Sequence, residues 1–380
     1  MAAYDVIVFG TGGIGSAALS SLARRGVRVL GLDQFPPAHD RGSSHGRTRL
    51  IRQAYFEHPD YVPLVLRAYT LWTDLSARRG RSLFRETGLL QVGRADGTVL
   101  PGVMASAARH RLDVERLDGT EIERRWPGYA VPAPLAGVYE PRAGILQVEQ
   151  CVQAHLDDAR EAGATLSTDE AVIDFRTGTD GITVETVRSR YTANRLVITA
   201  GPWGSRWLTE LGVPLVVRRK PLFWFATASP VYRASNGCPA FLYETPRGVF
   251  YGFPEVEPGE IKVAEHSGGQ IVDDPATIDR ELDRNDQARV EQFINEFLPQ
   301  VSPRLVAHTV CMYTMSPDEH FIVDRLPSDE RISFAAGLSG HGFKFAPVLG
   351  EALADLALDG RSSLPIDFLA CNRAALQTPK

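Results

Sequence analysis

Apolar runs and helical stretches alternate in the first part of the chain. Residues 4–10 form an apolar run rich in β-branched side chains, residues 16–25 have helical composition, and residues 27–32 form a second apolar run. A glycine-rich turn separates the first run from the helical stretch, and Asp33 ends the second run. The order of strand, glycine turn, helix, strand and acidic residue predicts a βαβ unit.

Similar patterns continue to the end of the chain. Alternation over residues 166–187 predicts antiparallel strands, and the aromatic stretches at 216–227 and 240–265 predict a β-rich region. Further helices are predicted at 60–77, 148–162, 287–298 and 345–358, and further strands at 89–93, 194–200 and 332–336.

These elements indicate an α/β fold with a β-rich part. We expect a Rossmann-like βαβ nucleotide-binding domain that carries an inserted substrate domain built on a mixed antiparallel sheet. The first domain is predicted to take residues 1–80, 145–214 and 326–380, and the second to take residues 81–144 and 215–325.

Composition narrows the class of protein. The chain of 380 residues is longer than one ordinary core needs, and its hydrophobic content of 44% is ample for burial. A net charge of −5 and the lack of a basic tail argue against nucleic acid or an anionic membrane surface as the main partner. No apolar run is long enough to span a membrane, and we expect no signal peptide before the first strand.

Cysteine and metal-ligand spacing exclude two further classes. Cys151, Cys238, Cys311 and Cys371 lie far apart and form no CxxC pair. This spacing argues against a disulfide framework or a zinc site, and it favours a cytoplasmic protein. We expect no catalytic metal, because no HExxH or similarly spaced ligand cluster occurs.

Lysine is unusually scarce in this chain. Of 41 basic residues only four are lysine, namely Lys220, Lys262, Lys344 and Lys380. The ammonium group of lysine is compact and can lose a proton, whereas the guanidinium of arginine is planar and stays charged. A lysine that persists in such a chain is therefore a candidate for a function that arginine cannot supply.

The glycine-rich turn has the context of a nucleotide site. Its predicted cofactor-binding residues are Gly10, Gly12, Gly13, Ile14 and Gly15. The glycines permit a tight turn and a close approach of the backbone to a pyrophosphate at the helix N-terminus. Asp33 can accept hydrogen bonds from ribose hydroxyls. The motif by itself does not separate FAD from NAD.

Four later blocks resemble one enzyme family. They are SSHGRTRLIR at residues 43–52, YGFP at 251–254 followed by Lys262 and His266, the stretch from Cys311 to Asp324, and GLSGHGFKF at 337–345. In this order they resemble the monomeric sarcosine oxidase and N-methyltryptophan oxidase family, over nearly the whole chain. The resemblance implies a two-domain oxidase of secondary amines that binds FAD covalently through a cysteine thioether.

The resemblance also implies roles for individual residues. Cys311 would carry the FAD, Lys262 would stabilise the charge that develops on O₂, and Arg52 with Lys344 would hold the substrate carboxylate. The other implied catalytic or pocket residues are Arg49, His45, Thr48, His266, Tyr251 and Tyr313, and the other implied cofactor contacts are Ser43, Ser44, Gly340, Gly342 and Lys344. Arg47 and Glu265 depart from the family pattern, and His320 and His341 are expected to be structural.

The leading interpretation is an FAD-dependent oxidase of sarcosine or another N-methyl amino acid. A hydride equivalent passes to the flavin, water hydrolyses the imine, and O₂ is reduced to H₂O₂. Oxidases of fructosyl or cyclic imino acids would use the same site. An NAD-dependent dehydrogenase leaves Cys311 unexplained, and a nucleotide-binding scaffold leaves Lys262 and Lys344 unexplained. The expected partners are a small amino-acid-like amine and O₂, and the expected state is a monomer.

Overall fold

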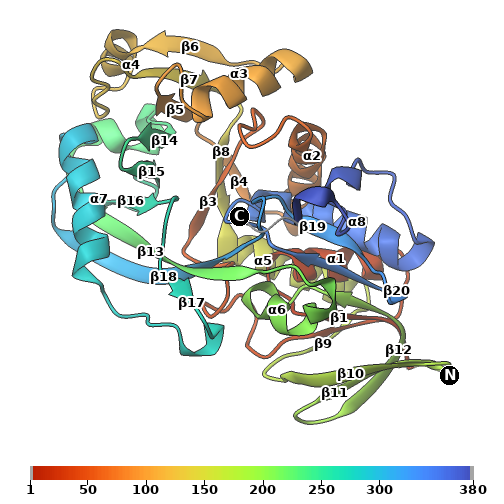
Figure 1. Cartoon of the computed structure of the whole chain (residues 1–380). Coiled ribbons are helices and arrows are strands. Elements are labelled where there is room, and N and C mark those ends of the chain that lie inside the picture. Colours follow the sequence, from red (N-terminus) through yellow and green to blue (C-terminus); the bar gives the residue numbers. More distant parts are fainter. Residues whose placement is uncertain (1–2, 377–380) are drawn as a thin grey trace.

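A computed structural model describes residues 3–376 and contains two large sheets that lie side by side (Figure 1). The first sheet has eight strands, with the order β10-β11-β12-β1-β2-β9 and with β20 joining β12 and β19 joining β20. Their bounds are β1 Tyr4–Phe9, β2 Val29–Leu32, β9 Thr165–Ser167, β10 Val172–Gly178, β11 Gly181–Thr186, β12 Arg190–Ile198, β19 Ile322–Leu326 and β20 Asp329–Ala336. Strand β1 is central and pairs in parallel with both β2 and β12, as the predicted βαβ unit requires.

Helices cover one face of the first sheet. Their bounds are α1 Gly13–Arg24, α2 Tyr61–Arg79, α5 Val148–Glu161 and α8 Ala346–Asp359. Helix α1 packs against both α5 and α8, and the apolar faces of these helices form one buried cluster with β1. Burial of this cluster fixes the N-terminus of α1 at the end of β1, where a nucleotide loop has to lie.

The second sheet has nine strands and includes the aromatic stretches. Its order is β17-β13-β16-β15-β14-β5-β7-β6, with β18 paired to β13. The bounds are β5 Leu89–Gly93, β6 Glu115–Asp118, β7 Ala136–Glu140, β13 Val216–Ala226, β14 Ala240–Thr245, β15 Gly248–Phe253, β16 Glu260–Glu265, β17 Ile271–Val272 and β18 Leu305–Met315. Helix α7 (Arg284–Phe297) covers one face, where Phe293 stacks on Phe250 with ring centroids 4.6 Å apart.

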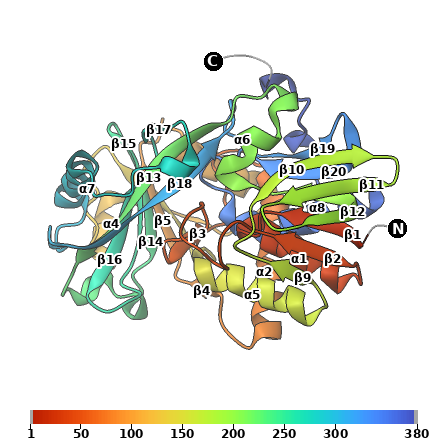
Figure 2. The same ribbon diagram turned by 90° about the horizontal axis from the view of Figure 1, so that it is seen from below.

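Smaller elements connect the two sheets. A three-stranded sheet contains β3 (Thr48–Ile51), β8 (Gly144–Gln147) and β4 (Phe84–Glu86). The helices α3 (Val99–His110) and α4 (Gly119–Arg125) pack near β5, β6 and β7, and α6 (Gly204–Trp207) follows β12. Figure 2 shows the nine-stranded sheet and the nucleotide-type sheet on opposite sides of the molecule, with β3 between them.

The predicted helices and strands are present, with ends that differ by a few residues. The helix predicted at 60–77 is α2, and the strand predicted at 89–93 is β5. Both large sheets take strands from separate parts of the chain, and the α/β fold class is confirmed. The exact domain boundaries stay a prediction. Within residues 3–376 no helix has the length and apolar character needed to cross a membrane.

Candidate active site

The loop between β1 and α1 forms one end of a long cleft. Gly10 has a φ of +86°, and a Cβ at this position would lie 2.5 Å from the Thr199 carbonyl oxygen. A Cβ at Gly15 would lie 1.7 Å from the Gly10 carbonyl oxygen. Both positions therefore require glycine, and the result is a tight turn whose backbone can approach a phosphate closely. Thr199, which sequence reasoning missed, also donates its hydroxyl to the Gly10 carbonyl at 2.6 Å.

Asp33 lies in the same cleft at the end of β2. Its Oδ2 accepts from the Thr11 amide at 2.6 Å and from the Thr11 hydroxyl at 3.1 Å. These bonds hold the carboxylate at a fixed position, where its oxygens can also accept from ribose hydroxyls. Thr11 is a further residue that sequence reasoning missed, because the x positions of a glycine motif carry no residue preference.

Most of the predicted cofactor contacts line this cleft, but Lys344 lines only the pocket beyond it. Ser44 Oγ accepts from the Gly13 amide at 3.0 Å and closes the glycine loop from the other side. The cleft is lined by Gly10, Gly12, Gly13, Ile14, Asp33, Ser43, Ser44, Gly340 and Gly342, and Gly15 lies beneath the loop. Phe35 and Trp203 add an aromatic wall near Asp33, with ring centroids 5.6 Å apart. A cleft with a glycine cradle, a ribose acceptor and aromatic faces fits a dinucleotide such as FAD.

A second pocket adjoins the far end of the cleft. Four residues line both cavities, namely Arg49, Tyr313, Gly340 and Phe343. The second pocket is also lined by the predicted residues Arg52, Tyr251, His266 and Lys344, and by Leu50, Phe56, Glu57, Leu242 and His341. The fold thus brings together residues from the N-terminal loop, the nine-stranded sheet and the closing segment at one place.

Arg52 is already paired in this pocket. Its Nη2 donates to both carboxylate oxygens of Glu57 at 2.6 Å, and its guanidinium lies over the Tyr55 ring, 4.1 Å from the centroid. Burial acts to raise the pKa of Glu57, but the charges of Arg52, His341 and Lys344 and the hydrogen bonds from Arg52 together outweigh it and lower that pKa to about 2. A substrate carboxylate at Arg52 therefore has to compete with Glu57, a residue that the sequence pattern did not single out.

The three internal lysines are all buried, with exposed fractions of 2% for Lys220, 3% for Lys262 and 6% for Lys344. Lys344 Nζ donates to the His341 carbonyl at 2.7 Å. Burial, together with the charge of Arg52, lowers the pKa of Lys344 to about 7. Within the described residues, Lys344 Nζ donates to only one other protein atom, the Tyr55 oxygen at 3.4 Å, so one of its three N–H donors is left for an anion.

Lys262 lies behind the wall that the two cavities share. Its Nζ donates to the Gly46 carbonyl at 2.6 Å and to the Thr48 carbonyl at 2.9 Å, and it faces the Phe253 ring at 4.9 Å. Arg49 Nη1 donates to the same Thr48 carbonyl at 3.0 Å. Burial and the nearby Arg49 lower the pKa of Lys262 well below its usual range. The strand prediction is confirmed, since Lys262 lies in β16.

Cys311 and His45 also lie beside the cleft. Cys311 Sγ is 3.2 Å from Arg49 Nη2 and 3.4 Å from the carbonyl oxygen of Ser43, and both of these residues line the cleft. His45 is buried, and its Nε2 has no hydrogen-bond partner within residues 3–376. Burial lowers the pKa of His45 to about 3, so the ring is neutral. His45 itself lines neither cavity, so its catalytic role stays a prediction.

His266 and Tyr313 meet across the second pocket, with His266 Nδ1 3.3 Å from the Tyr313 hydroxyl. Burial lowers the pKa of His266 to about 3, and the ring is neutral. Lys220 supports this histidine from behind, because its Nζ donates to the carbonyls of His266 and Ser267 at 2.9 and 2.7 Å. The scarcity of lysine was the one sequence signal that pointed to Lys220.

The two departures from the family pattern lie away from the pocket. Arg47 is half-exposed, pairs with Glu260 and lies over the Trp224 ring. Glu265 forms an ion pair of 2.6 Å with Arg289 on α7. Both side chains therefore have partners in the surface of the nine-stranded sheet. Within residues 3–376 no group of three His, Cys, Asp or Glu side chains is placed to hold a metal ion.

Comparisons with known proteins agree with this geometry. The family described as FAD dependent oxidoreductase matches residues 5–356. Monomeric sarcosine oxidase of Bacillus sp. (strain NS-129) is 40% identical over 379 residues, which cover 98% of each chain. N-methyl-L-tryptophan oxidase of Salmonella agona (strain SL483) is 42% identical over 362 residues, which cover 93% of this chain and 95% of the relative.

A solved structure of an amino acid oxidase has a similar fold. NikD, described as an unusual amino acid oxidase essential for nikkomycin biosynthesis, matches in its open form with a TM-score of 0.85 and 28% identity, over 97% of each chain. These matches favour an oxidase that uses FAD over a dehydrogenase that uses NAD. The chain therefore belongs to the FAD dependent oxidoreductase family, together with monomeric sarcosine oxidase and N-methyl-L-tryptophan oxidase.

Proposed function

We propose that this protein oxidises a secondary amine that carries a carboxylate, such as sarcosine or another N-methyl amino acid. The observation that carries the proposal is the pair of buried cations, Arg52 and Lys344, in the pocket that adjoins the nucleotide cleft. Arg52 has one carboxylate partner, Glu57, and Lys344 has none within residues 3–376, so the two buried cations leave one positive charge for a substrate carboxylate. The names of the relatives support the same substrate class.

The overall reaction balances with O₂ as the oxidant. Bound FAD would supply the two-electron acceptor between the amine and O₂. The amine loses two electrons and two protons to become an imine, which water converts to an aldehyde and the shortened amine, and O₂ becomes H₂O₂. For an N-methyl amino acid the aldehyde is formaldehyde.

The residues of the pocket bind and orient the amine. Arg52 leaves Glu57 to meet the substrate carboxylate, and Lys344 donates to the same group. This clamp directs the carbon that is oxidised toward the wall formed by Arg49 and Tyr313. His266 is neutral and adds no charge beside the amine. Tyr251 lines the same pocket and is buried, so it contributes an aromatic surface to the amine site.

The cleft supplies the residues for the cofactor. The glycine loop would hold the pyrophosphate, Asp33 the ribose, and Cys311 would form the thioether. The position of Cys311 Sγ supports this attachment, because Arg49 and Ser43, which contact it at 3.2 and 3.4 Å, both line the cleft. Lys262 would stabilise negative charge on O₂ near the shared wall. The four free thiols support a cytoplasmic location, and the names of the relatives support a monomer.

The test of the proposed function is a substrate comparison with purified holoenzyme. H₂O₂ release is measured with sarcosine, N-methyl-L-tryptophan, proline, a fructosyl amino acid and sarcosine amide. We expect an N-methyl amino acid to give the highest kcat/KM and its amide to be poor. Equal kcat/KM for the acid and the amide would overturn the carboxylate clamp, and a preference for proline or the fructosyl compound would reassign the substrate.

A further inference from the structure

A buried chain of hydrogen bonds continues behind Lys344. His341 Nε2 lies 3.0 Å from the Glu319 carbonyl oxygen. A carbonyl can only accept, so Nε2 carries the hydrogen. Burial lowers the pKa of His341 to about 4, so the ring is neutral and its Nδ1 is an acceptor. The Tyr55 hydroxyl, 2.5 Å from Nδ1, therefore donates to it.

Lys344 completes this chain at the substrate pocket. With its proton directed to His341, the Tyr55 oxygen is free to accept from Lys344 Nζ at 3.4 Å. The His341 carbonyl accepts from the same ammonium at 2.7 Å. We call the hydrogen-bonded chain from Glu319 through His341 and Tyr55 to Lys344 the relay. Its two acceptors, the Tyr55 oxygen and the His341 carbonyl, restrict the position of a flexible lysine side chain. The polarity of each bond follows from the carbonyl of Glu319.

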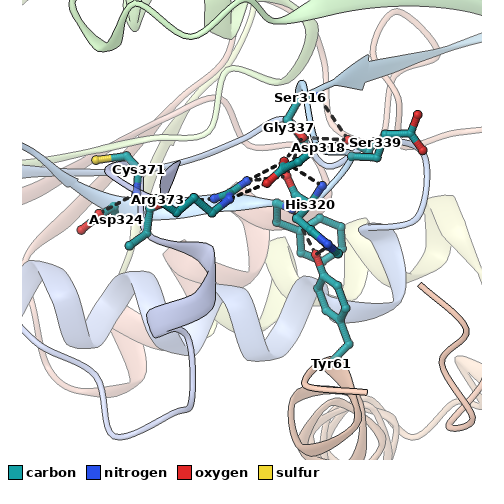
Figure 3. Close-up of polar contacts among 12 residues, drawn as sticks. Tyr61, Ser316, Asp318, His320, Asp324, Gly337, Ser339, Cys371 and Arg373 are labelled. Carbon is teal, nitrogen blue, oxygen red and sulfur yellow. Dashed lines mark hydrogen bonds and ion pairs between the residues drawn. The ribbon is translucent and has the colours of Figure 1, made fainter. Parts of the chain in front are cut away.

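The loop that presents this carbonyl is held by the C-terminal segment. Figure 3 shows Arg373 reaching Asp318, with His320 between this pair and Tyr61. Arg373 donates to the two carboxylate oxygens of Asp318 at 2.7 and 2.9 Å and to the His320 carbonyl at 3.1 Å. Asp318 and Arg373 are only 13% and 14% exposed.

The conformation of the loop needs such support. Glu319 has a φ of +63°, which is unfavourable for a residue with a side chain, so neighbouring contacts have to hold it. Ser316 adds one, since its hydroxyl donates to the His320 carbonyl at 2.6 Å. The backbone amide of Cys371 donates to Asp324 at 2.9 Å and ties the same C-terminal segment to β19.

We infer that His341 is a positioning residue for Lys344. The Arg373–Asp318 pair fixes the Glu319 carbonyl, and this carbonyl determines which nitrogen of His341 carries the hydrogen. Residues 371–376 then contribute to substrate recognition although none of them lines the pocket. The inference rests on the proposed role of Lys344 as a ligand of the substrate carboxylate. A purely structural role for Arg373 would affect stability alone.

Two variants interrupt the relay at different points. Arg373→Met removes the pair with Asp318 and keeps much of the side-chain length. Tyr55→Phe removes only the hydroxyl and keeps the ring beneath Arg52. Arg373→Lys, which retains one charged contact, should restore part of the effect. Arg331→Met is the matched control, because Arg331 forms a similar two-bond pair with Asp329 on β20.

The measurement is the ratio of dissociation constants for acetamide and acetate, from the change in flavin absorbance of the holoenzyme. In Arg373→Met and Tyr55→Phe this ratio should fall by about 3- to 10-fold, which corresponds to the loss of one hydrogen bond to the acetate site. We expect KM for sarcosine to rise in both variants, with a smaller change in kcat. Arg331→Met should leave the ratio unchanged.

The outcomes separate the inference from the proposed function. If the wild-type protein binds acetate and acetamide equally, the clamp itself is wrong. If it prefers acetate and both variants keep that preference, the relay is wrong, whatever their melting temperatures. A direct readout is ¹⁵N NMR of histidine-labelled protein, with His341→Gln used to assign the signal. The inference requires hydrogen on Nε2 of His341 in the wild type and a mixture of tautomers in Arg373→Met.

Discussion

The substitution Lys262→Met should affect the reaction with O₂ strongly and the stability of the fold only slightly. The ammonium of Lys262 donates to the carbonyls of Gly46 and Thr48. Each carbonyl keeps a second donor when the ammonium is removed, since Gly46 accepts from the Thr48 amide at 2.8 Å and Thr48 accepts from Arg49 Nη1 at 3.0 Å. Methionine also keeps an apolar chain against the Phe253 ring. We therefore expect the free energy of unfolding to change by less than about 1 kcal/mol.

The effect on the oxygen reaction should be much larger. A preorganised charge at a site where charge develops contributes about 3–4 kcal/mol, which is about 100- to 1000-fold in rate. Reoxidation of the reduced holoenzyme by O₂ should slow by this factor in Lys262→Met, whereas anaerobic reduction by sarcosine should change far less. Lys262→Arg should restore only part of the rate, because the planar guanidinium does not fit between the two carbonyls.

The pH dependence has a definite sign. The pKa of Lys262 is lowered well below its usual range, and a rise in pH removes the proton and with it the positive charge. Wild-type reoxidation should therefore slow as pH rises through that lowered pKa, and Lys262→Met should lack this step. Lys220→Met is the control, since Lys220 is equally buried but supports His266. Stopped-flow absorbance of each half-reaction gives the rates, and equal slowing of both in Lys262→Met would refute the oxygen role.

Three other perturbations test the site. Cys311→Ala should release flavin into the supernatant after acid precipitation, and peptide mass spectrometry of the wild type should find the added mass of FAD on Cys311; flavin on another cysteine would contradict the assignment. Glu57→Gln should tighten acetate binding about tenfold, since Arg52 loses a charged competitor. The substitution also lowers the pKa of Lys344, so the affinities are compared well below pH 7, and unchanged affinity would argue against competition. The pKa of Lys344 is about 7, so acetate affinity should fall as pH rises from 6 to 9, and Lys344→Met should remove that dependence.

Local sequence patterns were sufficient to predict the nucleotide-binding loop and the position of Asp33. The apolar runs at β1 and β2, the glycines between them and the acid at Asp33 all act within one short segment. Their physical requirements are local, because a strand, a positive φ at Gly10 and a helix N-terminus each depend on a few neighbouring residues. The resemblance then placed Arg49, Tyr313 and Lys344 in one site, and the structure brings them to adjoining cavities.

The electrostatic partners depended on the tertiary structure. Glu57 pairs with Arg52, and Lys262 donates to a carbonyl of Thr48 that is 214 positions away in the chain. A carbonyl is present at every residue, so a lysine in the sequence gives no sign of which backbone it will reach. The strand register of β16 and the path of the loop before β3 decide that contact.

The scarce lysines show what composition can predict and what depends on tertiary structure. Composition singled out Lys220, Lys262 and Lys344 as residues that arginine had not replaced, and all three proved to be buried. Composition alone could not say that Lys220 supports the His266 backbone while Lys344 adjoins a relay through Tyr55 and His341. The need for a small cation is a property of the residue, whereas its role depends on which carbonyls and rings the packing places around it.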